Sequence, residues 1–251
     1  MSRQHERGAS AVDDLDRDAR VESTEPNQQH ASEVSGTEGV PVDEAAGGDE
    51  FDLIPAILRN HSWFAMALLL LSLVGLVSSF MLTLEYIHKL QDAQANLICD
   101  INVFVTCAPA MQSTAGRLFG FPNIIIGLVG FTVPITTAMA MFAGARMRSW
   151  YWIGMQLGMI FAGGLITYLQ WFSAFELGRL CLWCMIIWAG TIPLVTLVTF
   201  YNGVHGHLGA GAARVFRRIA YYWWVAVILW VFAVIGMIFI GMGPLIANQI
   251  G

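Results

Sequence analysis

The sequence contains little charge. Only 12% of its 251 residues are charged, against 56% that are hydrophobic, whereas a soluble globular domain carries roughly 25% charged residues. Lysine is nearly absent, since Lys89 is the single lysine among 13 basic residues. This composition argues strongly against a water-soluble enzyme and indicates a chain that places most of its residues in lipid.

The charge that is present is divided unevenly along the chain. Residues 1–50 contain 13 acidic residues and 4 arginines (net −9), while residues 51–251 contain 9 basic and 5 acidic residues (net +4). The first segment has no apolar periodicity, so it cannot bury enough surface to offset the entropy of ordering it. We therefore expect 1–50 to be a disordered acidic tail and 51–251 to form the folded domain.

Five stretches lack Asp, Glu, Lys and Arg, and each is long enough to cross about 30 Å of hydrocarbon as a helix. They are Ser62–Leu84, Asn123–Ala145, Ser149–Phe175, Leu180–Tyr201 and roughly Tyr221–Ile246. They are too long and too uniform for the alternating strands of a membrane barrel. The sequence therefore predicts an all-α integral membrane protein with five transmembrane helices.

The basic residues near the ends of these stretches predict the orientation in the membrane. Six arginines flank one side: Arg59, Arg146, Arg148, Arg214, Arg217 and Arg218. Only Lys89, Arg117 and Arg179 flank the other. Because basic loops stay in the cytoplasm, we expect a multi-pass protein of the cell membrane whose N-terminus is cytoplasmic.

Cysteine is also scarce, with four in the whole sequence. Cys99 and Cys107 lie in the link 85–122, and Cys181 and Cys184 form a CxxC at the start of the fourth predicted helix. The predicted orientation places all four on the extracytoplasmic side, where disulfides persist. A thiol on the first turn of a helix has a lowered pKa, which favours thiol–disulfide exchange.

Other interpretations of the cysteines remain open at this point. Four cysteines allow three complete pairings, and their spacing does not choose among them. If the protein is a scaffold, its disulfides are merely structural. If the four cysteines are thiolates, they could bind zinc, although the seven residues between Cys99 and Cys107 exceed the usual spacing of zinc ligands. A transporter is disfavoured because no charged residue lies inside a predicted span.

The link that carries Cys99 and Cys107 also has local structure. We expect Glu85–Asn96 to extend the first helix, followed by a turn-rich segment that holds Cys107 near the bilayer surface and Cys99 on a more mobile loop. An apolar stripe at helical spacing then predicts one short interfacial helix. Its members are Met111, Ala115, Leu118 and Phe119.

Between about Leu97 and Trp188 the sequence resembles the vitamin K epoxide reductase family and its bacterial disulfide-forming homologues. The matching features are Cys99-Asp100, Cys107, Ser113, Asn123-x3-Gly127 and Cys181-x2-Cys184. Two positions depart from the family pattern. Trp188 stands where the animal enzymes have a tyrosine, which weakens any expectation of epoxide chemistry, and Met111 stands where an aromatic residue is usual.

The resemblance implies a four-helix bundle around a quinone, with a fifth transmembrane helix beside it, acting as the terminal oxidase of extracytoplasmic disulfide formation. Cys99 would take electrons from a partner, and Cys107 would relay them. Cys181 would accept them, and Cys184 would face the quinone. The implied disulfides are Cys99–Cys107 and Cys181–Cys184, with a transient Cys107–Cys181 link.

The same resemblance suggests which residues contact the quinone. Asn123 is the best candidate for a hydrogen bond to a quinone oxygen, although Asn also suits an N-cap. The indole of Trp188 would replace the tyrosine donor, and Ser113 is expected to orient the interfacial helix more than to touch the ligand. Phe131, Phe161 and Trp183 would line the pocket or, as we favour, simply pack or face lipid.

The ligand and the partner are the last expectations. We favour menaquinone, with ubiquinone and phylloquinone as alternatives, and we expect no metal and no nucleic acid. The sequence stops shortly after the fifth apolar stretch, without the thioredoxin-like domain that some bacterial members carry. We therefore expect a separate extracytoplasmic thioredoxin-fold oxidase of the DsbA type as the electron donor.

Overall fold

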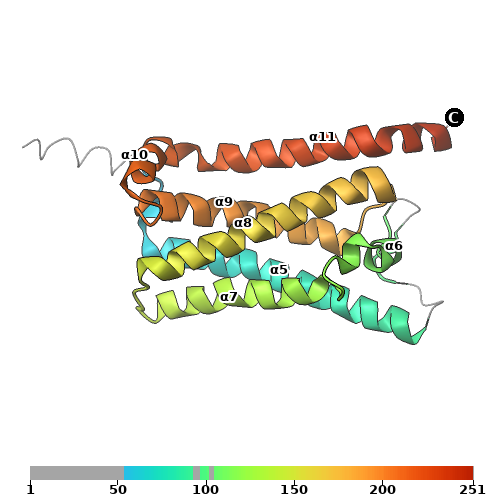
Figure 1. Ribbon diagram of the computed structural model, residues 1–251, viewed down its shortest axis with the longest axis horizontal. Coiled ribbons are helices and arrows are strands. Elements are labelled where there is room, and N and C mark those ends of the chain that lie inside the picture. The colour runs from blue at the N-terminus through green and yellow to red at the C-terminus, as the bar shows by residue number, and fades with distance from the viewer. Residues whose placement is uncertain (1–53, 93–96, 102–104, 251) are drawn as a thin grey trace, which may run out of the picture. The chain divides into compact units, whose positions relative to one another are not determined.

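The computed structural model describes residues 54–92, 97–101 and 105–250, and for 244–250 only the backbone (Figure 1). The predicted acidic tail, 1–50, lies outside the described residues. The end of the predicted extension of the first helix, 93–96, lies outside them as well.

Helices account for the described structure almost entirely. The long ones are α5 (His61–Gln91), α7 (Ile124–Phe142), α8 (Ser149–Phe172), α9 (Leu182–Val204) and α11 (Trp223–Ile250). The short ones are α4 (Ala56–Arg59), α6 (Ala108–Gln112) and α10 (Ala210–Ile219), with single turns η1 (Ala115–Arg117), η2 (Ser173–Leu177) and η3 (Ala220–Tyr222). Five helical stretches of the described residues are long and apolar enough to cross a membrane, which confirms the predicted all-α membrane fold.

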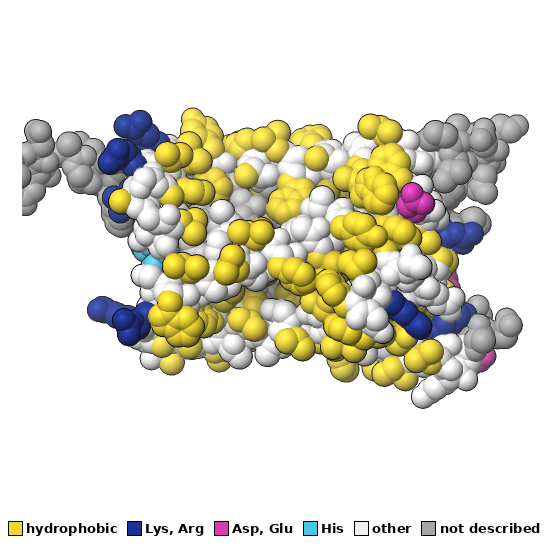
Figure 2. Space-filling view, in the orientation of Figure 1, with side chains coloured by type: hydrophobic (Ala, Val, Ile, Leu, Met, Phe, Trp, Pro, Cys, Tyr) yellow, Lys and Arg dark blue, Asp and Glu magenta, His cyan; other side chains and the backbone are white. Residues whose placement is uncertain are grey.

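Four of the long helices pack as a bundle. Helix α5 lies against α7 and α9, and α9 lies against α8, while α11 lies outside the bundle against α9 and η2 (Figure 1). Glycine allows one of these close approaches, because a Cβ on Gly75 of α5 would come within 2.3 Å of the Phe131 ring of α7. Figure 2 shows hydrophobic side chains between two ends where Lys and Arg gather, as expected for a chain that spans lipid.

Buried amides fix α8 against α9 in the half of the bundle farther from the cysteines. Asn202 is fully buried and donates from Nδ2 to Gln156 Oε1 at 3.0 Å and to the Trp152 carbonyl at 3.2 Å. Gln156 in turn donates from Nε2 to Thr199 Oγ1 at 2.9 Å. Polar contacts of this kind hold transmembrane helices in one register.

Helix α10 packs across the end of α9 through one tight contact. A Cβ on Gly203 would lie 2.2 Å from the Phe216 ring, which also meets the Phe200 ring edge-to-face at 5.3 Å. Alanine at Gly203 is therefore expected to destabilise the protein by about 1–3 kcal/mol through overpacking, measured as a lowered thermal unfolding midpoint in detergent. Adding Phe216→Ala should recover part of that loss, and two additive effects would contradict the proposed clash.

Candidate active site

A short backbone pairing brings the two cysteine segments together. Val105 and Leu180 form an isolated parallel bridge, and Thr106 N–H donates to the Leu180 carbonyl at 2.9 Å. Thr106 and Leu180, the two residues joined by this hydrogen bond, are each followed by a cysteine, so Cys107 lies beside Cys181. Their Sγ atoms are 3.2 Å apart, although the two residues are 74 positions apart in the sequence.

The four cysteines are in two different chemical states. Cys99 and Cys107 form a disulfide, whereas Cys181 and Cys184 are free thiols. A disulfide sulfur is not a thiolate, so this arrangement does not provide the four thiolates of a zinc site. It places a free thiol at contact distance from a disulfide, which is the geometry that thiol–disulfide exchange requires.

The segment that carries Cys99 is held against the bundle by polar contacts. Asp100 Oδ1 accepts hydrogen bonds from Thr106 Oγ1 at 2.5 Å and from Cys107 N–H at 3.2 Å. Ile98 N–H donates to Glu85 Oε1 at 3.2 Å, from the extended end of α5. Cys99 is fully buried, while its neighbours Ile98 and Ile101 are 82% and 62% exposed. A partner thiol therefore reaches the Cys99 sulfur only if this segment shifts.

Cys181 occupies the N-cap position of α9. Its Sγ accepts a hydrogen bond from Cys184 N–H at 3.4 Å. The pKa of the Cys181 thiol lies below its usual value because its sulfur interacts with the Cys184 side chain and accepts the backbone N–H groups of Cys184 and Trp183. These contacts outweigh burial and the charge of Asp100, both of which raise the pKa.

The lowered pKa of Cys181 predicts a pH dependence. Because the thiolate is the reactive form, Cys181 in a Cys99→Ser/Cys107→Ser chain should reach half-maximal modification by methyl methanethiosulfonate at a lower pH than a free cysteine in the same buffer. Adding Cys184→Ala removes the largest cause of the shift and should move the midpoint to higher pH. An unchanged midpoint would show that Cys184 does not tune this thiol.

The segment after Cys107 differs from the prediction. One helix was expected to carry Met111, Ala115, Leu118 and Phe119, but α6 ends at Gln112 and η1 covers only 115–117. The break occurs at Ser113, whose Oγ donates to the Ala110 carbonyl at 2.8 Å and accepts from Gly116 N–H at 3.0 Å. These bonds replace the helical ones, and they agree with an orienting role for Ser113.

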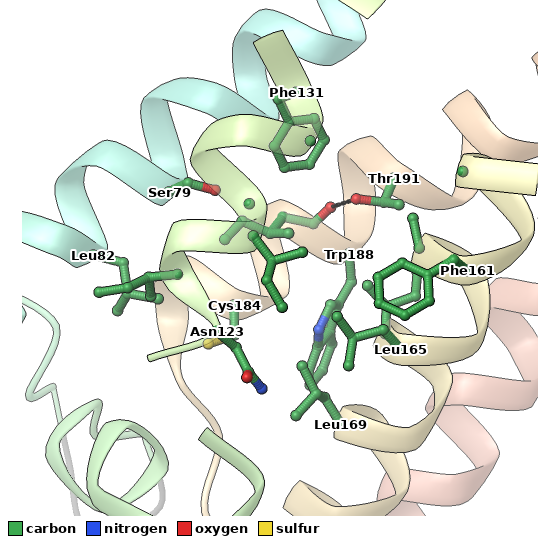
Figure 3. Close-up of a pocket in the computed structure, with 18 of the residues that line it drawn as sticks. Ser79, Leu82, Asn123, Phe131, Phe161, Leu165, Leu169, Cys184, Trp188 and Thr191 are labelled. Carbon is green, nitrogen blue, oxygen red and sulfur yellow. Dashed lines mark hydrogen bonds between the residues drawn. The ribbon is translucent and has the colours of Figure 1, made fainter. Parts of the chain in front are cut away.

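A largely apolar cavity of about 580 Å³ opens next to Cys184. Its walls come from α5, the α6–η1 segment, α7, α8 and α9, and α7 faces α8 across it. Figure 3 shows Asn123, Cys184 and Trp188 around one region of this space, with Phe161, Leu165 and Leu169 of α8 nearby. The volume is in the range of sites for small organic ligands.

The predicted ligand-contacting residues all line this cavity. They are Ser113, Asn123 and Trp188. Asn123 lies at the N-cap position of α7 but makes no capping bond with its side chain. Instead, its Nδ2 donates to the Ala115 carbonyl at 2.6 Å, and its buried Oδ1 has no hydrogen-bond partner among the described residues. A buried unpaired amide oxygen is costly, and it marks this end of the cavity as a place for a polar group.

Sequence reasoning missed part of the cavity wall and favoured a packing or lipid-facing role for two aromatic residues that line it. Phe131 and Phe161 line the cavity, whereas Trp183 packs among the cysteines. Ser79 and Thr191 also line it and were not predicted. Ser79 Oγ is buried without a partner. Its signal was a serine pair, Ser78-Ser79, inside a charge-free span, but nothing in the pattern said which serine would face the cavity.

Comparison with known proteins identifies one family. Searches of the curated proteins and of the solved structures found no match. The model of the vitamin K epoxide reductase family matches residues 66–199. This stretch is more than half of the chain and includes the four cysteines and every predicted ligand-contacting residue. The chain is thus a multi-pass membrane protein that belongs to the vitamin K epoxide reductase family, a family of oxidoreductases.

Proposed function

We propose that this protein is a thiol oxidase that carries electrons from an extracytoplasmic partner, through its four cysteines, to a membrane quinone, and so supports disulfide formation in exported proteins. The observation that carries the proposal is the 3.2 Å contact between the Sγ atoms of Cys107 and Cys181. It joins a disulfide to a free thiol and lies beside an apolar cavity.

The first half of the cycle is thiol exchange with the partner. A partner thiolate attacks Cys99 Sγ and displaces Cys107 as a thiolate. The second thiol of the partner then attacks the partner's sulfur in the mixed disulfide and releases Cys99 as a thiol. The partner is oxidised to its disulfide form. The Cys99–Cys107 disulfide is reduced to two thiols, which now hold the two electrons from the partner.

The second half moves these electrons inward. The Cys107 thiolate attacks Cys181 Sγ of the Cys181–Cys184 disulfide and displaces Cys184 as a thiolate. Cys99 then attacks Cys107, which restores the Cys99–Cys107 disulfide and frees Cys181. The product is a disulfide at Cys99–Cys107 with two thiols at Cys181 and Cys184, the same pairing that the structure has.

The residues around the cavity fit a quinone. Cys184 and the amide of Asn123, with its unpaired Oδ1, lie at one region of a largely hydrocarbon-lined space. A ring with polar oxygens and an apolar tail suits such a site. A bound quinone would accept the two electrons and two protons released when Cys181 and Cys184 form a disulfide. The indole N–H of Trp188 and the second Nδ2–H of Asn123 would donate to its oxygens, Asn123 Oδ1 would accept only from a hydroxyl of the reduced ring, and the apolar walls would exclude water.

A soluble quinone tests the proposal. The protein is reduced, freed of reductant and mixed with a short-chain naphthoquinone. Two thiols should disappear for each quinone reduced, which absorbance and thiol titration follow together. Persistence of all four thiols would overturn the proposal, and stoichiometric zinc in the purified protein would favour a structural metal site instead. Extraction of the purified protein identifies the native quinone, for which menaquinone is our first candidate, ahead of ubiquinone and phylloquinone.

The partner and the orientation belong to the same proposal. We take the donor to be a DsbA-type thioredoxin-fold protein on the side opposite a cytoplasmic N-terminus. In a Cys107→Ala chain the Cys99 thiolate should attack the disulfide of the oxidised donor, displace one donor thiolate and hold the donor as a mixed disulfide, because Cys107 is no longer there to displace the donor. Adducts found only at Cys184 would contradict the assigned order. Labelling of the trapped site by an impermeant reagent in intact cells tests the orientation.

A further inference from the structure

Helix α10, at the end of the bundle away from the cysteines, carries three arginines that have no acidic partner among the described residues. The acidic residues of the described chain are Glu85, Asp92, Asp100 and Glu176, and all belong to the cysteine end. Figure 2 shows Asp and Glu only near that end, and Lys and Arg at both. No ion pair involves the three arginines of α10 within the described residues. Within the described part of the chain, the charge of this cluster is therefore not neutralised.

Helix α10 presents its arginines in a defined direction. Arg214, Arg217 and Arg218 follow one another at the spacing of one helix face. The opposite face is fixed to the protein, because Ala213 is buried and Phe216 packs on Gly203. Arg217 Nε also donates to the Val204 carbonyl at 3.2 Å. The arginine face is thus held by contacts with the end of α9 and does not depend on lipid to form.

The position of α10 places this face at the membrane surface. The helix follows α9 and precedes α11 through η3. Helix α9 is long and apolar enough to span a membrane, and so is the stretch Ala210–Gly243, which begins in α10 and has α11 as its long apolar part. Tyr221 and Tyr222 are 62% and 57% exposed at the junction, where amphipathic rings meet lipid headgroups. Anionic phospholipids are therefore the anions that these arginines meet at highest concentration.

A depression at this place accommodates a headgroup. It has a volume of about 510 Å³, and its walls are Gly206, Ala210, Ala213, Arg214 and Arg217. Apart from the two arginines, these residues have side chains no larger than a methyl group, so the guanidinium groups dominate the chemistry of the depression. Arginine binds phosphate oxygens with paired N–H donors.

We propose that Arg214 and Arg217 bind the phosphate of an anionic phospholipid in this depression. The site is separate from the cysteines and does not rest on the proposed thiol oxidase activity. The ligand is the headgroup of a lipid in the adjoining leaflet, with its acyl chains along the surface of the bundle.

Native mass spectrometry of the full-length protein with dioleoyl phosphatidylglycerol tests this site, with dioleoyl phosphatidylcholine as the neutral comparison. At about 1 kcal/mol for each arginine, Arg214→Gln/Arg217→Gln should weaken phosphatidylglycerol binding about 30-fold. Arg214→Gln alone should weaken it about fivefold, and it leaves the bond from Arg217 to α9 intact, so that a loss cannot be assigned to misfolding.

The matched control removes the same charge from the same end of the protein. Arg146→Gln/Arg148→Gln alters the α7–α8 link and should reduce binding far less than the α10 pair. Equal losses for both pairs would overturn the proposal in favour of general surface charge. Equal binding of the two lipids by the unaltered protein would also overturn it. Complete displacement of phosphatidylglycerol by inorganic phosphate would show a site for free phosphate instead of lipid.

Discussion

Replacing Cys184 with serine is expected to abolish quinone reduction and to leave Cys107 exchanging between a disulfide with Cys99 and a disulfide with Cys181. The Cys181 thiol lies 3.2 Å from Cys107 Sγ, so it attacks the Cys99–Cys107 disulfide and releases Cys99. Without Cys184, only Cys99 can resolve the new link, and this restores the Cys99–Cys107 disulfide without passing electrons to the cavity. Quinone reduction should fall by at least about three orders of magnitude, as is usual when a reacting nucleophile is removed.

Peptide mapping without reduction, combined with quinone absorbance, checks both parts of this result. Cys99→Ser is the matched control, because it removes a cysteine of the other pair. With a small dithiol as reductant, this variant should still reduce quinone through Cys181 and Cys184, but it should not oxidise a protein partner. Quinone reduction by the Cys184→Ser chain would contradict the assignment of Cys184 as the thiol nearest the ligand.

Tryptophan at Gly158 is expected to block ligand binding without harming the fold. Gly158 lines the cavity from the middle of α8, and a Cβ added there has no neighbour within 4 Å. The indole then has room to enter the cavity and occupy volume that the ligand needs. The KM for a soluble quinone should rise at least about tenfold, which corresponds to about 1.4 kcal/mol of lost binding.

The same helix offers a control for this substitution. Gly164 also has no neighbour within 4 Å of an added Cβ, but it is not part of the cavity wall. Tryptophan there should leave the KM within about twofold, since neither change removes a packing contact. Thermal unfolding should be similar for both variants. An equal rise in KM for both would show that bulk on α8, and not occupation of the cavity, impairs the reaction.

The sequence predicted the helices well because each is a local pattern. A charge-free run marks lipid contact wherever it occurs, so Ser149–Phe175 and Leu180–Tyr201 closely match α8 with η2 and α9. The start of the fifth helix was also predicted closely, since it was expected at about Tyr221 and α11 begins at Trp223. The stripe around Met111 failed for a reason that is equally local, because hydrogen bonds of the Ser113 side chain break the helix.

The contacts between distant segments were not predictable in the same way. Nothing in the spacing of the cysteines indicates that Val105 pairs with Leu180, and without that pairing the place of Cys107 beside Cys181 is unknown. The burial of Cys99 was also not predictable. The hydrogen bonds of Asp100 and Glu85 that hold its segment in place join residues that are apart in the sequence. The family resemblance supplied the order of the cysteines, whereas the structure supplies the contacts that bring them together.

The N-cap position of Cys181 has a consequence for reduction potential. The backbone N–H of Cys184, 3.4 Å from Cys181 Sγ, stabilises a negative sulfur, and only the reduced form of the pair has one. Each 1.4 kcal/mol of such stabilisation raises the potential of a two-electron couple by about 30 mV. The start of α9 therefore makes the Cys181–Cys184 pair a stronger oxidant than it would be without this hydrogen bond, which would favour the proposed transfer of electrons from Cys107.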